Sequence, residues 1–86
     1  MSSRVIPPVA GLNGTGFDKL ASAAMEANDA VNDAIRALQE CAPHGRDYLT
    51  VSEHYAARDR HDAEMRKLYE VRQYIEAWVH AIGEAL

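Results

Sequence analysis

The sequence predicts an all-α protein in which two long helices fold back on each other as an antiparallel helical hairpin. Apolar residues recur every three or four positions in both halves of the chain, which is the period of one helix face. The only proline after the first eight residues is Pro43, and it lies in a short segment between the two halves. We expect residues 1–16 to form an irregular N-terminal arm and residues 17–86 to form the hairpin domain.

The first helix is predicted from about Phe17 to Glu40. Two prolines and three glycines precede it and disfavour a helix in the arm. Thr15 is the expected N-cap, since a hydroxyl can accept a hydrogen bond from a free amide of the first turn. The helix carries an apolar ladder with small rungs, which permits close approach of a second backbone: Leu20, Ala24, Ala27, Val31, Ala34, Leu38 and Cys41.

The second helix is predicted from about Val51 to Glu84, because this stretch has no proline and its only glycine is Gly83. Thr50 and Glu53 have the spacing of a capping box at its start. Its main ladder should pack on the first helix: Met65, Leu68, Arg72, Ile75, Val79, Ile82 and Leu86.

A second apolar ladder runs beside the main one, and we expect it to meet another chain: Val71, Tyr74, Trp78, Ala81 and Ala85. At 1.5 Å per residue, the helices are about 36 and about 50 Å long. Joined by a short loop, they should leave about two turns of the second helix uncovered at its C-terminal end, with Trp78, Val79 and Ile82 on them. The N-terminal arm, a second chain or both would have to cover this surface. Homodimerisation would in addition complete a helix bundle, with four helices in a dimer.

Composition restricts the classes of function. The chain has 86 residues, a net charge of −4 and a single cysteine, Cys41. An acidic balance argues against a nucleic-acid partner, and one cysteine excludes a disulfide within the chain and fits a reducing cytoplasm. There is no apolar run of 18 residues and no signal segment, so we expect a cytoplasmic protein without a membrane partner.

The first half of the second helix is different, because polar residues continue its main ladder. His54, Arg58 and His61 occupy these positions, and we expect them to face the Val31–Cys41 half of the first helix. In one interpretation their polar ends reach water at the edge of the contact between the two helices. In the other they form, with the neighbouring Tyr55, a face that binds a partner or a ligand.

Catalytic and metal sites are not indicated. The acidic pairs Glu26/Asp29 and Asp59/Asp62 have the i, i+3 spacing found in all-α magnesium-dependent nucleotide pyrophosphohydrolases, but such pairs also arise by chance on charged helices. Cys41 ends a helix, where the dipole disfavours a thiolate. We therefore expect no enzyme activity, no catalytic or metal-binding residues and no cofactor.

The connecting segment reads Ala42-Pro43-His44-Gly45-Arg46-Asp47-Tyr48. Over roughly residues 35–80, the chain resembles small helical proteins of bacteriophages and prophages that carry a Pro-x-Gly-Arg-Asp-Tyr turn between two helices. The matching residues, Gly45 to Tyr48, have structural roles in the turn. That group has no established activity, so the resemblance implies a bacterial host as context and no mechanism.

These observations lead to one leading hypothesis and two alternatives. The first is a non-enzymatic phage-type protein that acts by protein–protein interaction, as an inhibitor of an unidentified host or defence protein. The second is an oligomeric protein that binds a small ligand such as a signalling nucleotide, with Tyr55, Arg58 and His61 as candidate contacts. The third is a metal-dependent nucleotide pyrophosphohydrolase-like bundle.

Overall fold

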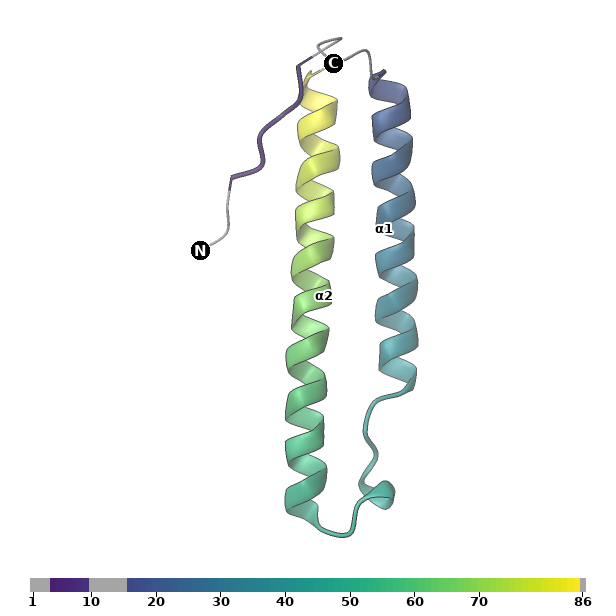
Figure 1. Ribbon diagram of the computed structural model, residues 1–86, viewed down its shortest axis with the longest axis vertical. Coiled ribbons are helices and arrows are strands. Elements are labelled where there is room, and N and C mark those ends of the chain that lie inside the picture. Colours follow the sequence, from purple (N-terminus) through teal and green to yellow (C-terminus); the bar gives the residue numbers. More distant parts are fainter. Residues whose placement is uncertain (1–3, 10–15, 86) are drawn as a thin grey trace.

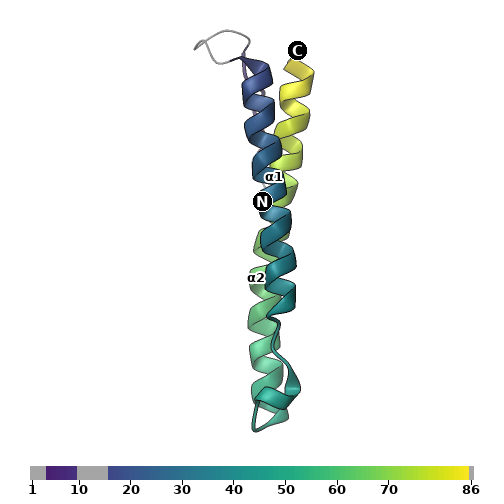
Figure 2. The same cartoon turned by 90° about the vertical axis from the view of Figure 1, so that its right-hand side faces the viewer.

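The computed structural model describes residues 4–9 and 16–85 and confirms the all-α hairpin. Helix α1 spans Phe17–Glu40, a single 3-10 turn η1 spans Gly45–Asp47, and helix α2 spans Val51–Ala85. The two long helices lie antiparallel and side by side (Figure 1). The view turned by 90° shows that they cross at a shallow angle (Figure 2), as expected when side-chain ridges of one helix pack into grooves of the other.

Local signals in the sequence explain the helix ends. The backbone amide of Glu53 donates to the hydroxyl oxygen of Thr50 at 3.1 Å, so the hydroxyl half of the expected capping box is present at the start of α2. At the start of α1 the capping residue is Gly16, which offers no side-chain cap. Thr15, the expected cap, and Leu86, the last rung of the main ladder, lie outside the described residues.

The core is a narrow seam between the helices. In the described part of the chain, the buried side chains are Ala24 and Ile35 of α1 and Met65, Ile75, Ala81 and Ile82 of α2. Between the buried residues of α2, three further positions of the ladder are half-buried: Leu68, Arg72 and Val79. The described rungs of the predicted Met65–Leu86 ladder therefore all face the seam.

The predicted ladder of α1 is partly wrong. Ala27, Ala34 and Cys41 are exposed, and Asn28 and Ile35 lie in the seam instead. The seam rungs are thus Phe17, Ala21, Ala24, Asn28, Val31, Ile35 and Leu38, with alternating steps of four and three. The physical reason is side-chain size: burying Ile35 removes far more apolar area from water than burying Ala34 does.

The predicted overhang is at the wrong end of α2. Figure 1 shows the C-terminal end of α2 level with the beginning of α1, and Ile82 is only 1% exposed. The surplus length lies at the other end, where the first turns of α2 extend beyond α1 beside η1. The cause is the connection 41–50, which runs along the long axis of the hairpin before α2 begins, so the chain turns back well below the end of α1.

Part of the N-terminal arm lies beside the hairpin. Residues 4–9 pass beside the last turns of α2 on the side away from α1 (Figure 1). Val5 and Pro8 are half-buried, whereas Ile6 and Val9 are exposed. The remaining arm residues, 1–3 and 10–15, lie outside the described part of the chain. Neither of the described helices is long and apolar enough to cross a membrane.

Candidate functional site

The overhanging start of α2 carries a cluster of aromatic and basic side chains. The ring of His54 lies between those of Tyr48 and Tyr55, with ring centroids 5.9 and 5.7 Å apart. The guanidinium carbon of Arg58 lies 4.9 Å from the centroid of the Tyr55 ring, which is within cation–π range. Arg58 lies three and four residues after Tyr55 and His54 on the same helix, which brings it close to both. The loop-end cluster is therefore a preformed surface of His54, Tyr55 and Arg58 beside Tyr48.

Large apolar side chains are exposed around this cluster. Leu49 is 96% exposed, Val51 is 67% exposed and Tyr55 is 50% exposed. They lie at the end of the hairpin where α2 extends beyond α1, so α1 does not cover them. Exposed apolar groups beside Tyr and Arg are typical of protein-binding surfaces.

The predicted polar seam is only partly present. His54 and His61 are half-buried, whereas Arg58 is exposed and folds over Tyr55. Of the three, His61 lies beside the expected Val31–Cys41 half, in a hollow that Gln39 also lines, whereas His54 packs near Gly45 of the 3-10 turn. This follows from the register, because the start of α2 lies opposite the connection and not opposite Val31–Cys41. The structure thus groups His54 with Tyr55 and Arg58, and places His61 in a separate hollow.

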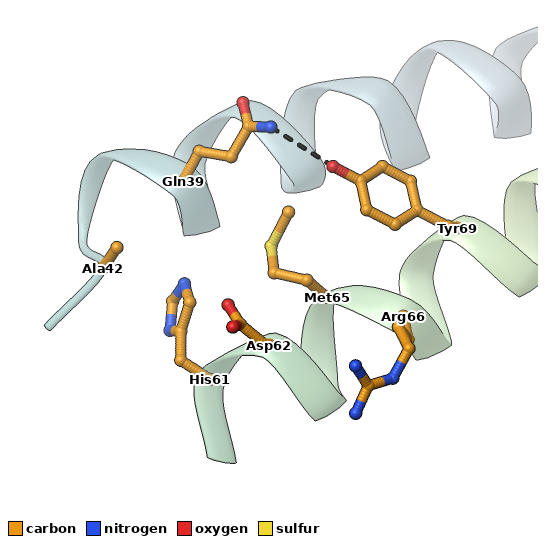
Figure 3. Close-up of a pocket in the computed structure, with 7 residues that line it drawn as sticks. All are labelled: Gln39, Ala42, His61, Asp62, Met65, Arg66 and Tyr69. Atoms are coloured by element: carbon orange, nitrogen blue, oxygen red, sulfur yellow. Dashed lines mark hydrogen bonds between the residues drawn. The ribbon is translucent and has the colours of Figure 1, made fainter. Parts of the chain in front are cut away.

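That hollow opens between the end of α1 and the middle of α2 and has a volume of about 380 Å³ (Figure 3). The side-chain amide of Gln39 donates to the hydroxyl oxygen of Tyr69 at 3.3 Å across one end of it. The imidazole of His61 points toward Ala42, and Arg66 extends away from α1. The His61 Nε2 atom is buried and has no hydrogen-bond partner among the described residues.

The acidic side chains do not form a metal centre. No group of three or more His, Cys, Asp or Glu ligands comes together among the described residues. Glu64 instead accepts hydrogen bonds from Lys67 at 3.0 Å and from Arg60 at 3.1 Å. The bond from Lys67 is the main reason that the pKa of the Glu64 carboxyl is lowered. This carboxylate is committed to an ion-pair cluster on the surface of α2.

The two sides of the hairpin differ in chemistry. One side is polar: Asn32 accepts a hydrogen bond from Arg72 at 3.1 Å, and Gln39 bonds Tyr69. Sequence reasoning missed these pairs, because they depend on the register between the helices. The other side is apolar, and we name it the alanine face. Its exposed or half-buried residues are Ala23, Ala27, Ala30, Ala34 and Ala37 of α1 with Val71, Tyr74 and Trp78 of α2.

The residues predicted to contact another chain fall on or next to this face. Val71 and Tyr74 are exposed, with Tyr74 at 56%, whereas Trp78 and Ala85 are half-buried. Ala81 is buried within the single chain, at a level of α2 where the arm also passes. Within the second apolar ladder, the residues that stay exposed in the single chain are therefore Val71 and Tyr74.

Comparison with protein-family models, with curated proteins and with solved structures finds no match to this chain.

Proposed function

We propose that this chain is a non-enzymatic protein that acts by binding another protein through its loop-end cluster. The observation that carries the proposal is the exposed apolar and aromatic surface of Leu49, Val51 and Tyr55, with Arg58 held over Tyr55. Tyrosine and arginine supply much of the binding energy in protein interfaces. A side chain already stacked in place also loses less conformational entropy on binding.

The nature of the partner comes from the resemblance of the connecting segment to phage and prophage proteins. It favours a protein of the bacterial host, in the cytoplasm, which the chain would inhibit by occupying one of its surfaces. Self-association belongs to the same proposal: two hairpins would form a four-helix bundle and present two loop-end clusters.

Affinity capture from a bacterial host lysate tests the proposal, with the full chain as bait. Tyr55→Ala should lose the captured protein, because it removes the ring on which Arg58 stacks. Tyr55→Phe is a matched control, since it keeps the ring on which Arg58 stacks and should keep the captured protein. Equal capture by wild type and Tyr55→Ala would contradict a role for the loop-end cluster.

One observation supports a second candidate, a binder of small ligands such as signalling nucleotides. The hollow beside His61 has a volume in the range of small-molecule sites, and the Nε2 atom of this histidine has no hydrogen-bond partner among the described residues. A thermal-shift panel of cyclic nucleotides tests this candidate. Stabilisation by one of them that disappears in His61→Ala would support it, and no shift with any of them would dismiss it.

A further inference from the structure

We propose that the alanine face binds a second copy of this chain, with α1 of one copy packed antiparallel against α2 of the other. The inference rests on the proposed self-association and specifies its geometry. The two copies are related by a two-fold axis parallel to the helices. Every helix of the resulting four-helix bundle then has two antiparallel neighbours.

The shapes of the two halves of the alanine face are complementary. On α1 the side chains are small, so a neighbouring helix can approach its backbone closely. On α2 they are large, with Val71, Tyr74 and Trp78 in succession. Because close packing requires large groups to meet small ones, the large side chains of one copy fit best on the alanines of the other.

The axial register of the hairpin aligns these two halves. Within one chain, Asn32 bonds Arg72 and Gln39 bonds Tyr69, which fixes the levels of the two helices. A two-fold axis parallel to the helices preserves these levels between copies. At that register Ala30 of one copy lies opposite Tyr74 of the second copy, and Ala34 lies opposite Val71 of the second copy. The alanines from Ala23 to Ala37 extend about one turn beyond Val71 and Trp78 at each end.

Charge favours a contact between α1 of one copy and α2 of the other over a contact between the two α1 helices. The exposed outer edge of α1 is acidic, with Glu26, Asp33 and Glu40 at successive positions. At the register above, Lys67 of the second copy lies between the levels of Asp33 and Glu40, while it also bonds Glu64 of its own chain. With a two-fold axis that crosses the helices at the level of Ala30, α1 would meet α1, and Glu26 would lie near the level of Asp33 of the second copy. Like charges at an interface are unfavourable.

The available area is sufficient for a specific dimer. A hairpin face as long as α1 measures about 36 Å by about 20 Å, which is about 700 Å² per copy. Standard interfaces bury about 800 Å² per partner. The arm does not occupy the centre of the face, because residues 4–9 lie beside the last turns of α2 and Tyr74 stays exposed.

Cysteine cross-linking tests the arrangement in the full chain. Cys41 is exposed and is replaced first, by Cys41→Ser, so that it cannot react. Two proteins are then made in this background, one with Ala30→Cys and one with Tyr74→Cys. Each is oxidised alone, and the two are oxidised as a mixture. A control mixture pairs Asp29→Cys with Gln73→Cys, two exposed positions outside the alanine face.

The proposal expects a covalent dimer from the mixture of Ala30→Cys and Tyr74→Cys, and little from either protein alone or from the control mixture. A disulfide formed by Ala30→Cys alone would overturn it in favour of α1 meeting α1. Light scattering on the Cys41→Ser parent distinguishes a wrong dimer geometry from an absence of self-association. A dimer mass without the mixed cross-link overturns the geometry alone, whereas a monomer mass at micromolar concentration overturns self-association as well.

Discussion

Truncation of Ile82 tests the observed register of the hairpin. Ile82 is 1% exposed and is the largest fully buried side chain in the described part of the chain. The helix lengths alone place it on an uncovered overhang, where truncation would cost little. In the structure the end of α2 lies beside the start of α1 (Figure 1). Ile82→Ala should therefore lower the free energy of unfolding substantially.

The magnitude follows from the atoms removed. Ile82→Ala deletes roughly three methylene equivalents at about 0.8 kcal/mol each, or about 2.4 kcal/mol of lost transfer free energy. The cavity left in the seam adds to this, and we expect a total of about 3 kcal/mol, inside the range of about 2–5 kcal/mol for such substitutions. A chain of this size has about 4–13 kcal/mol of stability, so the loss is a large fraction of it.

Urea unfolding followed by helical circular dichroism measures the effect. Protein concentration is held fixed, because self-association would make the midpoint depend on it. Ile6→Ala is the matched control, since Ile6 is 74% exposed and the same atoms are removed. We expect the control to change stability by less than about 0.5 kcal/mol. Equally small effects of both substitutions would refute the register.

Three further predictions concern the connection and the surface of α2. Thr50→Ala should cost about 1 kcal/mol in urea unfolding by removing a helix cap, and Thr50→Ser should not. Gly45→Ala should be neutral or stabilise by up to about 1 kcal/mol, since its new methyl group would lie in ordinary contact, 3.5 Å from His54; a large loss in the same assay would contradict this. Lys67→Met should raise the pKa of Glu64 in a carboxyl NMR titration. The lowered pKa means that the stabilisation is present at neutral pH and is lost as the pH falls through the folded-state value, so an unchanged titration would contradict the assignment.

The helix boundaries follow from local chemistry, which explains why they could be predicted. Helix α1 matches its predicted range, and α2 ends one residue later than expected. Pro43 and the hydroxyl of Thr50 act on their own neighbours, so they can be interpreted without knowledge of the fold. The stacking of Arg58 on Tyr55 is equally local, as both lie on one helix face.

The axial register of the two helices and the side of α1 that faces α2 could not be predicted. Both depend on contacts between segments that are distant in the sequence. Two ladders compete on α1, one through Ala34 and one through Ile35, and only packing against α2 decides between them. The path of the connection decides which end of α2 overhangs. His61 and Tyr69 each meet the end of α1 as a result, and the hollow between the helices exists only at this register.

The central claim is that the hairpin completes its core with a second copy of itself. Light scattering coupled to size exclusion tests it most directly, on the unmodified chain at micromolar concentration. The account predicts a mass of twice the 9.5 kDa of one chain, about 19 kDa. A mass of 9.5 kDa with an intact helical spectrum would contradict it.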